Sequence, residues 1–161
     1  MDNQWSPQIN LGVSVLIPET YVSDLDVRLG LYRRLSGLTK KVEFEGFAAE
    51  LIDRFGKLPS EVNTLLLVVR IKSVCKKAGI GKLDGGPKGA TLQFHNDKFI
   101  SPEGLVEFIN QQNGMAKVKD NKLIIRRDWR KNSDKFKGAF TIAKDLAEIA
   151  ASYKKKNSTK K

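Results

Sequence analysis

The chain has 161 residues, of which 40% are apolar, and a net charge of +11. This apolar content suits one hydrophobic core, so we expect one domain with frayed ends. The sequence has no run of about 18 apolar residues and no signal-peptide pattern at its start, which predicts a cytoplasmic protein without membrane contact. The only cysteine, Cys75, lies in the apolar pattern of a predicted helix, and we expect a buried, unreactive thiol.

The positive charge is concentrated toward the C-terminus. Residues 1–60 hold 7 Lys or Arg against 8 Asp or Glu, whereas residues 116–161 hold 15 against 5. Residues 153–161 (YKKKNSTKK) contain five of these lysines and almost nothing to bury. We therefore predict a disordered basic tail over 153–161.

The first part of the chain is predicted to be extended and then helical. Apolar residues alternate from Ile9 to Ile17, which is typical of a strand or extended segment, and we assign residues 1–17 to a linker. Helices are predicted at about 23–36, 42–55 and 60–78. The first should begin at the N-cap Ser23, and Gly56 should end the second. The apolar residues expected to face inward in the first two helices are Leu25, Leu29, Tyr32, Leu35, Phe44, Phe47, Ala48, Leu51, Ile52 and Phe55.

The second part predicts a small β unit with covering helices. Short strands are expected at 80–83 and 90–94, joined by a glycine-rich loop. Ser101-Pro102-Glu103 is a typical helix start. Asp120-Asn121 suits a hairpin turn between strands at 115–119 and 122–126, and a last helix begins near Ser133. The expected fold is α+β: N-terminal helices followed by a mainly antiparallel sheet, within a domain over residues 18–152.

No set of residues in the sequence indicates catalysis. The segment Gly79–Gly89 is rich in glycine, but Lys88 is followed by Gly89 and the loop joins two strands, so it predicts turns and not a phosphate-binding loop. His95 is the only histidine and has no cluster of metal ligands around it, so we interpret it as a surface turn residue. We therefore expect no catalytic, cofactor-binding or metal-binding residue in this chain.

A tryptophan among cations leaves two interpretations open. Arg126, Arg127, Trp129, Arg130 and Lys131 lie close together in the sequence. Aromatic and arginine side chains in such a cluster can stack on nucleic-acid bases, which predicts a basic nucleic-acid-binding module over residues 116–161. The alternative is a tryptophan packed under the following helix, with its neighbouring cations solvated.

Four motifs in order carry a resemblance to a known family. They are LIPETYVSDLDVRLGLYRRLS at 16–36, ELIDRFGKLPSEV at 50–62, LLLVVRIK at 65–72 and AGIGKLDGGPKG at 78–89. Together they resemble the C-terminal domain of the bacterial transcription-repair coupling factors (Mfd). The resemblance is specific over about residues 9–96 and looser to about residue 150.

The resemblance implies a regulatory function without catalysis. In this family a motor that uses ATP and Mg²⁺, the contact with RNA polymerase and a repair module all precede the C-terminal domain. That domain packs on the N-terminal repair module and covers the surface used by the excision-repair damage-recognition protein. The resemblance thus implies an intramolecular partner, indirect links to that protein and to RNA polymerase, and at most weak nonspecific DNA binding.

Charged helix positions are the candidate contacts for such a partner, because a charged interface can be competed off and gives specificity. On the first and third helices these candidates are Arg28, Arg33, Arg34, Arg70 and Lys72. Asp53 and Arg54 either belong to the same interface or pair with each other to fix the break at Gly56.

Overall fold

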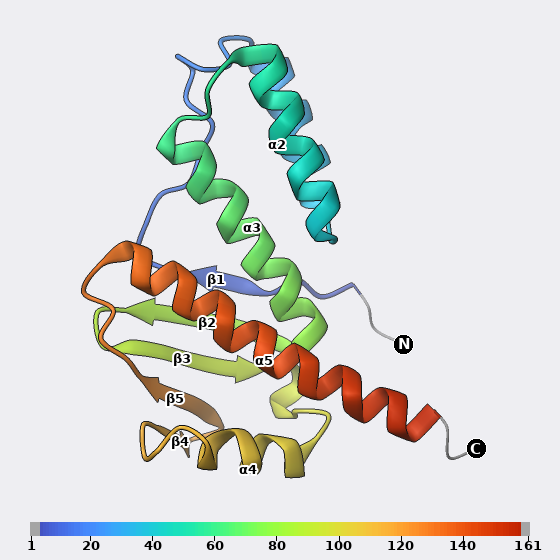
Figure 1. Ribbon diagram of the computed structural model, residues 1–161, viewed down its shortest axis with the longest axis vertical. Coiled ribbons are helices and arrows are strands. Elements are labelled where there is room, and N and C mark those ends of the chain that lie inside the picture. Colours follow the sequence, from blue (N-terminus) through green and yellow to red (C-terminus); the bar gives the residue numbers. More distant parts are fainter. Residues whose placement is uncertain (1–3, 159–161) are drawn as a thin grey trace. The chain divides into compact units, whose positions relative to one another are not determined.

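The computed structural model describes residues 4–158, which form two compact units (Figure 1). The helical unit is Val13–Ser73, and the sheet unit consists of residues 4–12 together with the chain from Val74 onward. The boundary falls inside α3 (Ser60–Ala78), so this helix contributes residues to both units. The domain expected over residues 18–152 thus includes parts of both compact units.

The sheet unit contains a five-stranded sheet that is antiparallel except at one edge. Its strand order is β1-β2-β3-β5-β4, and only β1 runs parallel to its neighbour β2. The strands are β1 (Gln8–Asn10), β2 (Ile80–Gly86), β3 (Gly89–Phe94), β4 (Ala116–Lys119) and β5 (Lys122–Arg126). Helices followed by a mainly antiparallel sheet confirm the predicted α+β fold.

The N-terminal segment is part of this fold. Ile9 is paired with Leu83 of β2, and its neighbours Gln8 and Asn10 are in register with Lys82 and Asp84. Residues 8–10 form an edge strand, which agrees with the expected extended segment, and residues 13–17 belong to the helical unit. Residues 1–3 lie outside the described part of the chain.

Two helices cover the sheet unit. Helix α5 (Asn132–Ser158) crosses one face of the sheet, and α4 (Pro102–Asn110) lies beside β4 and contacts α5 (Figure 1). The Ser101 hydroxyl accepts a 3.1 Å hydrogen bond from the Gly104 N–H, which confirms the predicted start of α4. The inward face of α5 follows the helical period and comprises Phe136, Ala139, Ile142, Ala143, Leu146 and Ala150.

The two hairpins have the predicted turns. Asp120 and Asn121 have φ values of 53° and 62°, which Asp and Asn tolerate better than most residues. In the β2–β3 hairpin Gly89 has a φ of +127°, and a Cβ built there would lie 2.1 Å from the Ile125 carbonyl oxygen. The glycine-rich segment thus makes a tight strand connection, as predicted.

The C-terminal lysines continue a helix. The sequence predicts disorder from Tyr153 onward, but α5 extends to Ser158, so that prediction is corrected for residues 153–158. The rest of the predicted tail, 159–161, lies outside the described residues. Tyr153 and Ile149 of α5 line a groove between α4 and α5. Within residues 4–158, no helix is both long enough and apolar enough to span a bilayer.

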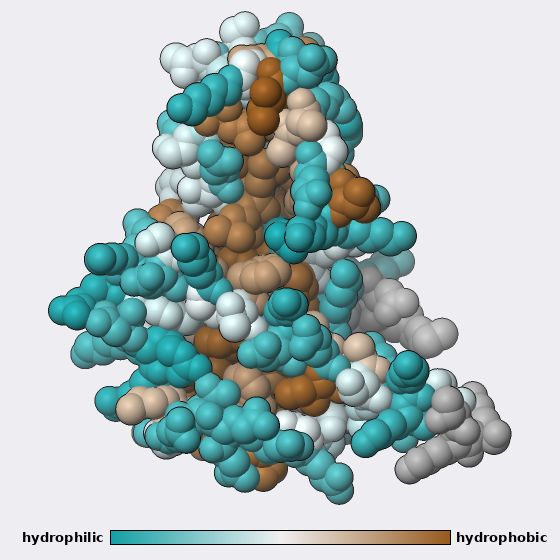
Figure 2. Space-filling view, in the orientation of Figure 1, coloured by the Kyte–Doolittle hydropathy of each residue, from teal (hydrophilic) through white to brown (hydrophobic). Residues whose placement is uncertain are grey.

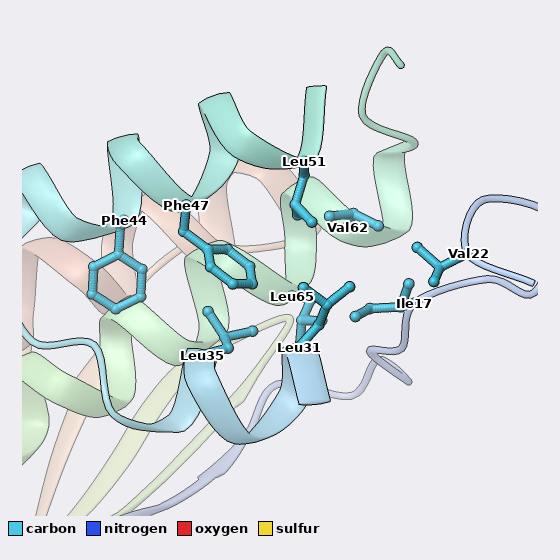
Figure 3. Packing of buried hydrophobic residues seen from close by; sticks show 9 residues of the cluster. All are labelled: Ile17, Val22, Leu31, Leu35, Phe44, Phe47, Leu51, Val62 and Leu65. Carbon is cyan, nitrogen blue, oxygen red and sulfur yellow. The ribbon is translucent and has the colours of Figure 1, made fainter. Parts of the chain in front are cut away.

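The helical unit is built around one apolar cluster (Figure 3). Helices α1 (Leu25–Ser36) and α2 (Lys41–Phe55) pack with the first part of α3. The aromatic residues of α2 point toward the leucines of α1, and the preceding segment adds two aliphatic side chains. The buried residues of the cluster are Ile17, Val22, Leu31, Leu35, Phe44, Phe47, Leu51, Val62 and Leu65.

Helix α1 buries only part of the predicted face: Leu35 is buried and Tyr32 packs against the cluster, as predicted. Leu31 is buried as well, but Leu25 and Leu29 are 58% and 43% exposed. The N-cap is Asp24 and not Ser23, because the Asp24 carboxylate accepts a 3.0 Å hydrogen bond from the Val27 N–H. On α2, Ile52 is likewise exposed, contrary to prediction. Pairs spaced i, i+4 identify possible helix faces, but packing decides which one is buried.

Candidate interaction surface

The break between α2 and α3 is held by hydrogen bonds to main-chain groups. Gly56 ends α2 with a φ of +93°, and its N–H donates to the Ile52 carbonyl at 2.9 Å. The Tyr21 hydroxyl lies 2.7 Å from the Gly56 carbonyl oxygen and 3.1 Å from that of Leu51. The break is therefore tied to the segment before α1, which fixes the C-terminal end of α2 within the helical unit.

Glu50 joins α1 to α2 by binding two arginines. The Arg34 guanidinium donates to both carboxylate oxygens of Glu50 at 2.6 and 2.7 Å, and Arg54 donates to one of them at 3.0 Å. Each arginine also lies over an aromatic ring, Arg34 over Phe47 and Arg54 over Phe55. The hydrogen bond from Arg34, followed by that from Arg54, lowers the pKa of Glu50 from 4.5 to about 2. The carboxylate is thus a fixed anion between two fixed cations at the surface.

The predicted local pair of Asp53 with Arg54 does not form, because Arg54 turns to Glu50. Asp53 is exposed, as is Arg33 on α1. Within the described part of the chain, neither makes an ion pair. We name Arg33, Arg34, Glu50, Asp53 and Arg54 the charged surface of the helical unit. Glu50 was not among the residues selected from the sequence, although its i, i+4 spacing from Arg54 indicates an ion pair on a helix.

Arg28 is not available to a partner. It is 9% exposed, and one guanidinium nitrogen donates to the main-chain oxygens of Val22 and Ser23 at 2.7 and 3.1 Å. It also forms an ion pair with the exposed Glu19 at 3.5 Å. Its placement among the interface candidates is therefore corrected: Arg28 satisfies buried main-chain carbonyls ahead of α1.

The α3 candidates differ in exposure. Lys72 is exposed, whereas Arg70 is half-buried. The Ser73 hydroxyl donates to the Thr39 carbonyl at 3.2 Å, which ties this part of α3 to the turn before α2. Because it is exposed, Lys72 remains a candidate contact for a partner, in addition to the five residues of the charged surface.

Trp129 is packed under α5 and cannot stack on a base. It is 4% exposed, and its main-chain N–H donates to the Pro87 carbonyl at 2.9 Å. A Cβ added to Gly138 of α5 would come within 2.5 Å of its ring. Of the two interpretations left open by the sequence, the packed tryptophan is confirmed, and base stacking by Trp129 is wrong.

The cations around Trp129 are partly engaged. Arg130 makes a bidentate pair with Asp128, with distances of 2.7 and 2.8 Å. Arg127 donates to the Gln112 side chain and to the Arg126 carbonyl. Arg126 and Lys131 are exposed. Arg127 and Arg130 are therefore held by hydrogen bonds, whereas Arg126 and Lys131 are exposed.

Within residues 4–158, no three His, Cys, Asp or Glu side chains gather as metal ligands. Burial raises the pKa of Cys75 to about 12, in keeping with the predicted unreactive thiol. His95 lies in a 3₁₀ turn (His95–Asp97), but it is half-buried and stacks on Trp5 with ring centres 4.2 Å apart. The predicted turn is therefore confirmed, but the expectation that His95 is exposed at the surface is wrong.

Comparison with known proteins places the chain in a family. The sequence profile of the TRCF domain matches residues 11–105. The chain is 44% identical to the transcription-repair-coupling factor of Rickettsia conorii over 119 residues, which is 73% of this chain and 10% of that protein. It is 33% identical to that of Escherichia coli K12 over 105 residues, or 65% of this chain and 9% of that protein.

A solved structure shares the fold. The crystal structure of the C-terminal domain of transcription-repair coupling factor superposes with a TM-score of 0.74 at 21% identity, and the match covers 94% of this chain and 98% of that one. The chain spans about a tenth of the length of the curated relatives it matches. On the strength of the profile match and these relatives, the chain belongs to the TRCF domain family of transcription-repair coupling factors.

Proposed function

We propose that this chain is a non-catalytic regulatory domain that holds a transcription-repair coupling factor in a resting state. Its partner is the N-terminal repair module of the same polypeptide. Closure hides the surface that the excision-repair damage-recognition protein needs, and it restrains the ATP-driven motor until RNA polymerase is engaged. Membership in the TRCF domain family supports the proposal that the chain is part of a coupling factor. The charged surface of the helical unit supports the proposal that it contacts its partner through charged residues.

The arrangement at Glu50 is the observation that carries this proposal. Arg34 and Arg54 are held in place by Glu50, whereas Arg33 and Asp53 beside them are exposed without an ion pair in the described residues. A rigid frame with two free charges of opposite sign suits a partner of complementary charge. Because water and salt weaken such contacts, a second partner can compete for them.

Regulation of this kind requires differential affinity. A contact that exists in the closed state and is lost in the open state shifts the resting population by its own free energy. For a shift from about 1:99 to 99:1, the difference must reach about 5.5 kcal/mol. The two free charges supply part of that difference, and the exposed Leu25 and Leu29 on α1 add apolar area.

A charge-reversed variant of the whole parent protein tests the proposal. Arg33→Glu with Asp53→Lys leaves the net charge unchanged and touches neither the core nor Glu50. We expect raised ATP hydrolysis without RNA polymerase and stronger binding of the damage-recognition protein. The control is Glu107→Lys with Lys137→Glu, two exposed residues of the sheet unit, which should behave as wild type. Unchanged hydrolysis and unchanged binding in the charge-reversed protein would contradict the proposal.

A further inference from the structure

The strand register defines a sheet face that α5 does not cover. Residues in register on antiparallel neighbours point to the same side. The buried pair Leu92 and Leu123 faces the helices, so Thr91 and Ile124, which pair with each other, face the opposite side. We call this opposite side the open face. Alternation along β2, β4 and β5 adds Lys82, Asp84, Lys117, Lys119, Lys122 and Arg126 to it.

The open face is strongly cationic. Five of those six residues are Lys or Arg, and the single acid, Asp84, lies 3.8 Å from Lys82 of the same strand. Lys119 and Lys122 are directly opposite each other on β4 and β5. Like charges directly opposite each other destabilise a strand pair, so these two lysines do not contribute to the stability of the sheet. An anionic ligand would relieve the repulsion.

A groove opens beside these cations. It has a volume of about 970 Å³ and is lined by Gly86, Thr91 and Ile124, with Lys88 and Arg126 among its charged residues. A Cβ added at Gly86 would meet no atom within 4 Å, so ligand atoms can approach the main chain there. Arg127, Asp128 and Arg130 also line the groove, and Asp128 forms an ion pair with Arg130. Cations from β5, from the β2–β3 turn and from the segment before α5 therefore converge on one concavity.

The composition of the open face favours phosphate over an acidic protein. Lysine is depleted in protein interfaces, where aromatic anchors are enriched. None of the residues that the register places on the open face is aromatic. Without aromatic platforms the face has nothing on which unpaired bases could stack, which disfavours a single strand. Lysines spread over neighbouring strands match the regular phosphates of a duplex.

We propose that the open face of the sheet binds the phosphate backbone of duplex DNA without reading its sequence, through Lys117, Lys122 and Arg126 and with the adjoining groove as part of the contact. This surface differs from the sequence-based interpretation of residues 116–161, because Trp129 is buried and takes no part. It is also independent of the charged surface of the helical unit. The binding is nonspecific and strongly dependent on salt.

Two variants of equal charge test the proposal. The first, Lys117→Gln with Lys122→Gln and Arg126→Gln, removes three charges from the open face. The second, Lys154→Gln with Lys155→Gln and Lys156→Gln, removes three charges from the exposed end of α5. Fluorescence anisotropy with a labelled duplex of about 20 base pairs is measured for the whole chain over a range of salt concentrations. Circular dichroism verifies that both variants are folded.

The open-face variant should bind the duplex at least about tenfold more weakly, and its log–log salt slope should fall by about 2–3, since each phosphate contact contributes about 0.9. The α5 variant should change affinity less than about threefold. Equal losses in the two variants would overturn the proposal, because only net charge would then matter. Failure of the wild-type chain to bind at about 50 mM salt would also overturn it and would favour an acidic protein as ligand. The Arg33→Glu/Asp53→Lys variant should bind DNA as wild type does, which separates this test from that of the regulatory function.

Discussion

The two units of this chain use charge in different ways. The helical unit holds 9 Lys or Arg against 8 Asp or Glu, and two of its surface arginines, Arg34 and Arg54, share the carboxylate of Glu50. The described part of the sheet unit holds 18 against 9, with lysines opposite each other on neighbouring strands. Balanced, paired charge suits recognition of one protein surface, whereas unbalanced charge suits a polyanion. The net charge of +11 for the whole chain does not reveal this difference between the two units.

The largest expected effect tests whether the helical unit depends on its own core. Leu51 is 1% exposed within the cluster of Figure 3, so Leu51→Ala should lower the free energy of unfolding by about 2–5 kcal/mol. Both tryptophans, Trp5 and Trp129, lie in the sheet unit, so their emission follows that unit alone. Urea unfolding followed by far-UV circular dichroism should show the larger shift, and Trp emission a smaller one. Equal shifts of both signals would show that the units unfold as one.

The next effect concerns the packing of the sheet unit. A methyl group at Gly138 would lie 2.5–2.6 Å from three atoms of the Trp129 ring, so Gly138→Ala forces the ring to move. We expect a loss of about 1–3 kcal/mol and a red-shifted emission, because Trp129 becomes more exposed. Gly46→Ala is the control, since no atom lies within 4 Å of its added Cβ. An unchanged emission spectrum in the Gly138 variant would contradict the packing described for Trp129.

A smaller effect tests the network at Glu50. Its pKa is about 2 in the folded chain against an ordinary 4.5, so its contribution to stability is complete above pH 4.5 and is lost as the pH falls toward 2. Glu50→Gln should therefore flatten the dependence of unfolding free energy on pH in this acid window. Glu45→Gln, an exposed change on the same helix, serves as the control. Urea unfolding at several pH values measures both, and parallel pH profiles of wild type and Glu50→Gln would argue against the network.

The smallest expected signal is the reaction of Cys75. Its thiol is fully buried and its pKa is raised to about 12, so almost no thiolate is present near neutral pH. A chromogenic thiol reagent should react slowly with the folded chain and at the rate of a free thiol in urea. Rapid labelling of the native chain would show that this part of the sheet unit opens easily.

Element types were predictable from sequence because local signals determine them. Ser101 as a cap, Asp120-Asn121 as a turn and Gly56 as a helix end each follow from main-chain geometry. Helix faces were less predictable. The pairs Leu25/Leu29 and Leu31/Leu35 have the same spacing, and only the second is buried.

Contacts between residues far apart in the chain could not be predicted from the sequence. Arg34 and Glu50 are 16 residues apart, and nothing local distinguishes Arg34 from the buried Arg28. The pairing of Lys119 with Lys122 was implied by the hairpin turn, but the open face needed the register of β3 as well. Trp129 packs under the following helix, which was one of the two interpretations that the sequence left open, and Gly138 leaves room for its ring.

Binding of the isolated chain to the N-terminal repair module, measured by titration calorimetry, tests the central claim most directly. We expect wild type and the open-face variant Lys117→Gln/Lys122→Gln/Arg126→Gln to bind this module with affinities within about twofold. The Arg33→Glu/Asp53→Lys variant should bind at least about tenfold more weakly, which corresponds to about 1.4 kcal/mol. If the charge-reversed chain binds as tightly as wild type while the open-face variant loses affinity, the helical unit is not the regulatory contact.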